Sequence, residues 1–279
     1  MRVPSPLAVS AALRLGRWAN ALTAAAGVVV GAWWAGWGGV ENAQPIALAA
    51  LAAIALTAAA NSWNDIADVD IDRLAHPERP LPSGAVTPAA AERIAMAAAT
   101  LGVVCASAVS VTLGVCTVAV LALMRLYSPW LKRAGFAGNL VVSVLASLPF
   151  VYGSYAAGGW QKGLPLVLIA IPLHLARELA KDLDDREADQ STRRTLPVIA
   201  GVRPARLVLV AALVAAGAAL AIGIAPLVKS PALLVAALVP AMAALALATT
   251  LALRGRPGSP AFFKLAMVCA MAALLVARA

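Results

Sequence analysis

Long apolar stretches separated by short polar segments run through the whole chain. Runs of about 20 apolar residues are long enough to cross the hydrocarbon core of a bilayer as α-helices. The pattern predicts nine such helices, at residues 16–37, 44–63, 88–108, 110–126, 137–157, 163–181, 204–224, 231–253 and 260–277. The boundary inside residues 88–126 is the least defined, because that run is nearly continuous and has no polar break. We therefore expect an all-α, polytopic membrane protein.

The composition supports this interpretation. The chain has 279 residues, of which 62% are hydrophobic and 13% are charged, whereas a soluble domain carries about 25% charged residues. The apolar excess needs lipid to face. The three cysteines have no metal-site spacing and lie within apolar runs, where inert buried thiols are expected: Cys105, Cys116 and Cys269.

The basic residues predict the orientation of the chain. Nine helices place the two ends of the chain on opposite sides. All of the 22 Lys and Arg residues except Lys162, Lys229 and Arg278 then fall on the N-terminal side. By the positive-inside rule that side is cytoplasmic. The net charge of +9 is thus explained by orientation and by anionic lipid or substrate, and nucleic acid is not needed. The predicted location is the plasma membrane.

The acidic residues gather in two segments. All 13 Asp and Glu residues except Glu41 and Glu92 lie in residues 65–78, the first Asp window, or in residues 178–189, the second Asp window. Each window contains Asp-x-x-Asp-x-x-x-Asp, a spacing that places three carboxylates on one face of a helix. The windows follow the second and sixth predicted helices, so both should face the cytoplasm.

Three carboxylates on one helix face repel one another, and neighbouring apolar helices raise that cost. A divalent cation would neutralise them, and hard oxygen ligands suit Mg²⁺ together with substrate phosphate oxygens. Two such clusters could hold two or more Mg²⁺ ions around a diphosphate and withdraw charge from it as a leaving group. The alternative is a pair of solvated acidic loops. An EF-hand is disfavoured because neither window has its Gly and terminal Glu.

These residues resemble the signatures of the UbiA-type intramembrane prenyltransferases. Asn64-Asp65-x-x-Asp68-x-x-x-Asp72, followed by Arg79-Pro-Leu-Pro-Ser-Gly84, is similar to the first signature. Lys181-Asp182-x-x-Asp185-x-x-x-Asp189 is similar to the second. The resemblance extends over most of the chain to about residue 200, and includes Arg14-Leu-x-Arg17-x-x-Asn20, Tyr127-Ser-x-x-Leu-Lys132 and Gly138-Asn139.

The resemblance implies one domain over residues 1–279 with nine transmembrane helices around a central cavity. Within it, the repeated windows predict two half-repeats, about 1–135 and 136–279. The implied reaction is Mg²⁺-dependent transfer of a prenyl group from its diphosphate to a lipophilic acceptor. Loss of diphosphate leaves an allylic cation, which the acceptor attacks. No required protein partner is evident.

The resemblance also implies roles for single residues. Metal ligation is implied for Asn64, Asp65, Asp68, Asp72, Asp182, Asp185 and Asp189, with Asp68, Asp72, Asp185 and Asp189 as the catalytic set. Contact with the diphosphate is implied for Arg73, Arg79, Lys132, Lys181 and Tyr127. Contact with the acceptor is implied for Arg17, Asn20 and Asn139.

Several of these residues have a simpler interpretation. Arg73, Arg79 and Lys132 could be positive-inside anchors, and Tyr127 could be an interfacial aromatic residue. Asn20 could form a hydrogen bond between helices, since an unpaired amide in an apolar span is costly. The sequence leaves these alternatives open.

The acceptor is less well defined than the donor. The motifs around Tyr127 and Lys181 look most like the digeranylgeranylglyceryl phosphate synthase branch, whose acceptor is geranylgeranylglycerol phosphate and whose donor carries geranylgeranyl. Ala188 stands where that branch has Gly. Prenylation of an aromatic acceptor in quinone, chlorophyll or haem biosynthesis remains an alternative. An alcohol acceptor must lose a proton, to an Asp of the windows or to diphosphate itself.

Other classes of protein fit less well. Soluble prenyl synthases and terpene cyclases also use paired Asp motifs, but they lack nine apolar helices. A cation-coupled transporter usually carries its acids near the bilayer midplane on broken helices, whereas here the acids lie at helix ends. A non-catalytic scaffold is a further alternative.

Overall fold

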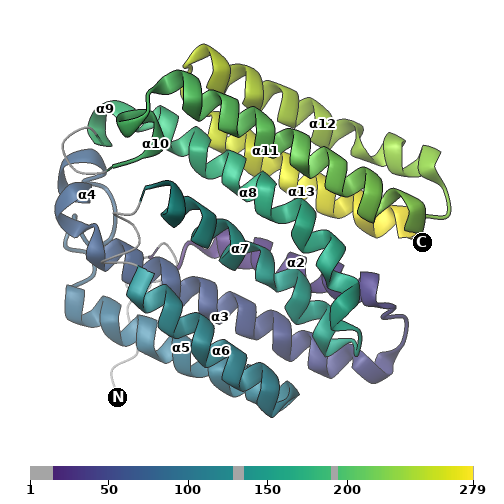
Figure 1. The fold of residues 1–279 in the computed structure, drawn as a ribbon. Coiled ribbons are helices and arrows are strands. Elements are labelled where there is room, and N and C mark those ends of the chain that lie inside the picture. Colours follow the sequence, from purple (N-terminus) through teal and green to yellow (C-terminus); the bar gives the residue numbers. More distant parts are fainter. Residues whose placement is uncertain (1–14, 128–134, 190–193, 279) are drawn as a thin grey trace. The chain divides into compact units, whose positions relative to one another are not determined.

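The computed structural model describes residues 15–127, 135–189 and 194–278, and every regular element within those ranges is helical. The chain divides into two compact units. Unit 1 comprises Met1–Val28 and Gly39–Trp130, and unit 2 comprises Val29–Gly38 and Leu131–Ala279. Helix α2 (Trp18–Ala35) begins in unit 1 and ends in unit 2. The all-α prediction is confirmed for the described part of the chain (Figure 1).

Unit 1 is built around the long helix α3. After the first part of α2, its elements are η1 (Val40–Asn42), α3 (Ala43–Ala67), α4 (Val69–Ala75), α5 (Pro88–Val109) and α6 (Val111–Tyr127). Helix α5 packs against both α3 and α6 (Figure 1). The start of α5 is specified locally: Pro88 occupies its first turn, and the Thr87 hydroxyl accepts a hydrogen bond from the Ala90 amide at 3.2 Å.

The structure separates the two helices that the continuous apolar run left poorly defined. Helix α5 ends at Val109, and Ser110 is extended, with φ −166° and ψ 154°. The Ser110 hydroxyl then accepts a hydrogen bond from the Leu113 amide at 3.0 Å, at the start of α6. A single serine therefore divides the run, because its side chain can satisfy an amide that a new helix leaves without a partner.

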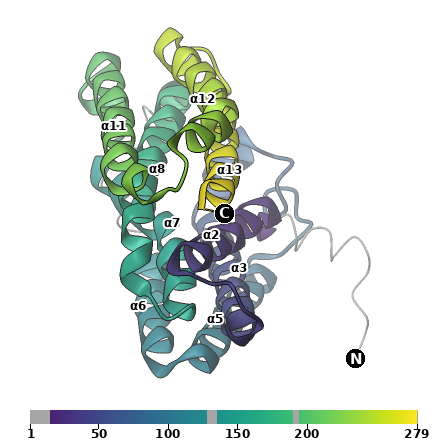
Figure 2. The ribbon, with the colours of Figure 1, turned by 90° about the vertical axis from the view of Figure 1, so that its right-hand side faces the viewer.

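Unit 2 is built around α8. Its elements are α7 (Phe136–Ala156), η3 (Trp160–Gly163), α8 (Leu164–Asp184), α9 (Arg186–Asp189), α10 (Leu196–Ile199), α11 (Val202–Gly223), η4 (Ala225–Leu227), α12 (Pro231–Arg254) and α13 (Ser259–Arg278). Helix α8 packs against α7, α11 and α13, and α12 pairs with α13 (Figure 1, Figure 2).

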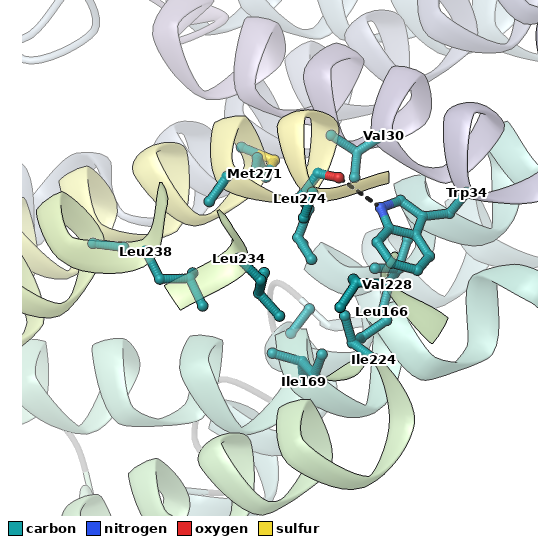
Figure 3. Packing of buried hydrophobic residues seen from close by; sticks show 14 of the residues in the cluster. Val30, Trp34, Leu166, Ile169, Ile224, Val228, Leu234, Leu238, Met271 and Leu274 are labelled. Atoms are coloured by element: carbon teal, nitrogen blue, oxygen red, sulfur yellow. Dashed lines mark hydrogen bonds between the residues drawn. The ribbon is translucent and has the colours of Figure 1, made fainter. Parts of the chain in front are cut away.

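The last part of α2 is fastened to α13 within unit 2. The Trp34 indole donates a hydrogen bond to the Leu274 carbonyl at 3.2 Å, inside a cluster of buried side chains from α2, α8, α12 and α13 (Figure 3). The neighbouring Trp33 indole donates to the Leu275 carbonyl at 3.1 Å. On α7, the Phe150 carbonyl approaches Gly31 so closely that a Cβ at Gly31 would overlap it.

Seven of the described helices are long and apolar enough to cross a membrane: α3, α5, α7, α8, α11, α12 and α13. The chain is therefore a multi-pass membrane protein, as the pattern of apolar stretches predicted. The two other predicted spans are also helical, but α2 and α6 are shorter, at 18 and 17 residues.

Candidate functional site

The first Asp window bends where its helix ends. Helix α3 stops at Ala67, and Asp68 has φ −98° and ψ 2° before α4 begins. Backbone bonds nevertheless continue through the bend, from the Asp68 amide to the Asn64 carbonyl at 3.0 Å and from the Asp72 amide to the Asp68 carbonyl at 2.8 Å. The three Asp residues of the motif thus keep a near-helical spacing, although Asp65 lies on α3, Asp68 in the bend and Asp72 on α4.

Two carboxylates of this window are buried, and each has an arginine partner. Arg17 Nη2 lies 2.5 Å from Asp65 Oδ1, and Arg79 Nη1 lies 2.7 Å from both carboxylate oxygens of Asp72. The side chains of Asp65 and Asp72 are each 6% exposed, against 85% for Asp70. Buried charges need such partners, because desolvation is costly without them.

The segment before α2 holds Arg17 in place. Arg17 has a left-handed backbone, with φ 48°. Its predecessor Gly16 accepts a hydrogen bond from the Asn61 amide side chain at 3.1 Å, and Leu15 packs with Leu81 in a small buried cluster. Asn61, four residues before Asp65, therefore anchors the backbone that presents Arg17. A pocket of about 180 Å³ in unit 1 is lined by Arg17, Asp65, Glu78, Arg79 and Pro80.

A second polar group in unit 1 was not predicted from the sequence. The indole of the buried Trp63 donates to Glu92 Oε1 at 3.4 Å. Arg125 Nη2 lies 3.9 Å from the same oxygen, and its guanidinium carbon lies 5.7 Å from the centre of a Trp63 ring. The group joins α3, α5 and α6 next to Asn64. The available signal was that Glu92 is one of only two acids outside the Asp windows.

The second Asp window repeats the bend of the first. Helix α8 stops at Asp184, and Asp185 has φ −90° and ψ 5° before α9 begins. The Asp185 amide bonds to the Lys181 carbonyl at 2.8 Å, and the Asp189 amide bonds to the Asp185 carbonyl at 2.9 Å. In both windows the middle Asp occupies the bend and the last Asp is buried. The sequence repeat is thus also a repeat of backbone shape.

The partners of the second window come from α7, α8 and the turn before α13. Asn139 donates from Nδ2 to Asp182 Oδ2 at 2.6 Å. The buried Glu178 accepts from Arg177 Nη1 at 2.7 Å and from Lys181 Nζ at 2.8 Å. Asp184 accepts from the Gly258 amide at 2.9 Å. Asn139 is therefore placed against a member of the window, and Lys181 is tied to Glu178.

The structure says less about how the other predicted site residues lie relative to the Asp motifs. Arg73 Nη1 pairs with the exposed Asp70 at 2.8 Å, and Asn20 is half-buried in the first turn of α2. Lys132 and the side chain of Tyr127 lie outside the described residues. The two windows belong to different units, so their meeting in one site stays a prediction.

The donor sets fit a hard divalent cation. Within the described residues of each unit, no three His, Cys, Asp or Glu side chains form a ready-made metal cluster. Mg²⁺ does not need one, because it commonly takes one or two carboxylates and completes its shell with water and phosphate oxygens. The predicted ligands, Asn64 and six Asp residues, offer only carboxylate and amide oxygens, which is the chemistry that Mg²⁺ prefers.

Comparison with known proteins finds relatives in the family that the Asp windows resemble. The digeranylgeranylglyceryl phosphate synthase of Ignicoccus hospitalis is 36% identical over 197 residues, which are 68% of this chain and 64% of that protein. The match therefore spans less than two thirds of the length of that relative. The apo structure of a UbiA homolog from Aeropyrum pernix K1 has a TM-score of 0.79 at 21% identity, covering 92% of this chain and 96% of the other.

A further solved structure has the same fold. It is a UbiA homolog from Archaeoglobus fulgidus bound to DMAPP and Mg²⁺, with a TM-score of 0.58 at 17% identity, covering 93% of this chain and 98% of the other. The sequence matches the description "UbiA prenyltransferase family" over residues 20–273. The resemblance seen in the Asp windows is confirmed, and this chain belongs to the UbiA prenyltransferase family.

Proposed function

We propose that this protein is a Mg²⁺-dependent membrane prenyltransferase that transfers a geranylgeranyl group from its diphosphate to geranylgeranylglycerol phosphate. The observation that carries the proposal is the pair of Asp windows, which share spacing, backbone bend and a buried last Asp. Family membership supports the reaction class, and the name of the Ignicoccus relative supports the acceptor.

The donor end of the reaction belongs to the two windows. The residues that would hold Mg²⁺ are Asn64, Asp65, Asp68, Asp72, Asp182, Asp185 and Asp189. Bound there, Mg²⁺ would withdraw charge from the departing diphosphate. Arg73, Arg79, Lys132, Lys181 and Tyr127 contact the diphosphate. The buried positions of Asp72 and Asp189 support this assignment, because a solvated acidic loop has no reason to bury its carboxylates.

The acceptor end involves Arg17, Asn20 and Asn139. Contacts within each unit support this placement, because Arg17 is fastened to Asp65 and Asn139 to Asp182. In the reaction, the bond between the first carbon of the prenyl chain and the diphosphate oxygen breaks, and the electron pair leaves with diphosphate. The acceptor hydroxyl oxygen bonds to that carbon and gives up its proton, to a window carboxylate or to diphosphate.

The proposed enzyme is one domain of two half-repeats with nine membrane spans and both windows on the cytoplasmic side of the plasma membrane. The repeated bend supports the half-repeats. The helical, apolar character of α2 and α6 supports nine spans, and the distribution of Lys and Arg supports the orientation.

The proposed function can be tested by measuring prenyl transfer with two different acceptors, each with and without Mg²⁺. Purified protein in detergent receives geranylgeranyl diphosphate with either geranylgeranylglycerol phosphate or an aromatic hydroxy acid, and products are identified by mass spectrometry. We expect only the ether product, lost with EDTA and restored by Mg²⁺. Product formation that survives EDTA would overturn the metal assignment. If only the aromatic acid is prenylated, the proposed acceptor is wrong and the enzyme acts on an aromatic acceptor.

A further inference from the structure

Both oxygens of the Asp72 carboxylate accept from one guanidinium nitrogen. Arg79 Nη1 lies 2.7 Å from both Asp72 oxygens, and the Asp72 side chain is only 6% exposed. Arg79 lines the pocket of unit 1 and Asp72 does not, and a divalent cation at the Asp72 oxygens would be repelled by the guanidinium that contacts both of them. Metal ligation by Asp72, as proposed above, therefore favours the release of at least one oxygen by Arg79.

The charged side chains at the pocket carry no excess of positive charge. Arg17 and Arg79 line the pocket together with Asp65 and Glu78. The two arginines are already paired with Asp65 and Asp72. A diphosphate would thus find no surplus of positive charge here. Releasing Arg79 alone would leave Asp72 buried without a partner, which is strongly unfavourable. Release of Asp72 by Arg79 therefore becomes favourable only when a cation binds to Asp72 and a diphosphate binds to Arg79 at the same time.

We propose that Arg79 is an exchangeable partner of Asp72: it neutralises Asp72 before the donor binds and turns to the diphosphate when a divalent cation takes its place. Cation and diphosphate then bind as a pair, and neither binds well alone. This inference rests on the proposed function and adds the order and coupling of binding. It gives Arg79 a role that a permanent ion pair or a membrane anchor does not have.

The surroundings of Arg79 suit an exchange of the side chain over a fixed backbone. The Val86 amide donates to the Pro80 carbonyl at 2.9 Å, and the Ser83 amide donates to the Arg79 carbonyl at 3.0 Å. Leu81 and Val86 are buried in the cluster with Leu15. The Arg79 side chain is 31% exposed and borders the pocket of about 180 Å³, so the guanidinium has room to turn.

The test measures binding of Mn²⁺, as the probe for the divalent site, to the purified full chain with and without inorganic pyrophosphate. In the unchanged protein, pyrophosphate should tighten Mn²⁺ binding strongly. Arg79→Gln should bind Mn²⁺ alone about 10-fold more tightly or better, because a unit charge next to the cation is gone. It should also lose most of the effect of pyrophosphate. Arg79→Lys keeps the charge and should lie between the two.

Two further variants make the result specific. Arg93→Gln removes the same charge from an exposed arginine of α5 and should leave both measurements unchanged. Asp72→Asn added to Arg79→Gln should remove the gain in Mn²⁺ affinity. Thermal unfolding with and without Mn²⁺ reports folding, and Mn²⁺ should raise the Tm of Arg79→Gln more than that of the unchanged protein.

The outcomes separate this inference from the proposed function. If Arg79→Gln is folded, binds Mn²⁺ no more tightly than the unchanged protein and keeps the pyrophosphate effect, Arg79 is a static partner and the exchange is wrong. If Arg79→Gln does not fold, unaltered Mn²⁺ binding in Arg79→Lys leads to the same conclusion. If the unchanged, folded protein binds no Mn²⁺ even with pyrophosphate, the proposed metal-dependent function fails as well.

Discussion

At the scale of single residues, the Asp windows divide their carboxylates by environment. Asp65, Asp72 and Asp189 are buried, whereas Asp68 is half-buried and Asp185 is exposed at the two bends. Buried carboxylates contribute to the fold through their partners, so replacing them mixes stability with function. The middle Asp of each window is the cleaner probe of chemistry.

Asp68→Ala and Asp185→Ala should each abolish prenyl transfer while the protein still folds. Loss of an outer partner of a metal ligand already costs about 10–100-fold, so loss of a ligand should cost more than about 100-fold. Turnover per folded protein is the measurement, with thermal unfolding in detergent as a check. Asp70→Ala, at an exposed position of the same segment, should stay near normal. Near-normal turnover in Asp68→Ala or Asp185→Ala would break the two-window model.

At the scale of elements, close approach of helices depends on small residues as much as on apolar ones. Helices α2 and α7 meet where Gly31 faces the Phe150 carbonyl. The same part of α2 is tied to α13 by Trp33 and Trp34. The end of α2 is therefore held from two sides within unit 2, and a bulkier residue at Gly31 would force one of these contacts apart.

Gly31→Ala should lower the stability of the protein by roughly 1–3 kcal/mol, the usual cost of overpacking against atoms that cannot move aside. Gly217→Ala is the matched control, since no atom lies within 4 Å of a Cβ at that position of α11. It should be neutral or stabilising by up to about 1 kcal/mol. Thermal unfolding in one detergent compares the two, and equal Tm values would contradict the close approach.

At the scale of the whole molecule, the proposed nine spans make a prediction about sidedness. Ser83, Lys229 and Arg256 are exposed positions between helices. In a background without Cys105, Cys116 and Cys269, a membrane-impermeant maleimide should label Lys229→Cys in intact cells. Ser83→Cys and Arg256→Cys should be labelled only after permeabilisation, because their segments follow even-numbered spans. Labelling of Ser83→Cys and Arg256→Cys from opposite sides would exclude nine spans.

Much of the helical framework was predictable because its signals are local. Apolar runs of membrane length appear as helices close to the predicted bounds, and the Asp spacing survives as a near-helical face. The bends at Asp68 and Asp185 were not predicted, since the sequence pattern continues through both. The division between residues 108 and 110 was predicted to within about one residue, but the role of Ser110 in it was not, because one small hydroxyl among apolar residues hardly changes the average hydrophobicity.

By itself, the sequence determined the membrane class, the helices and the two acidic segments, because hydrophobicity and helical spacing act over neighbouring residues. Only the tertiary structure decided which side chains meet. Arg17 reaches Asp65, Arg79 occupies Asp72, Asn139 holds Asp182, and Glu92 joins Trp63. Most of these pairs bring together segments far apart in the chain, and all depend on how the helices and turns pack. That packing is set by contacts between residues far apart in the chain, so it cannot be read from local sequence patterns.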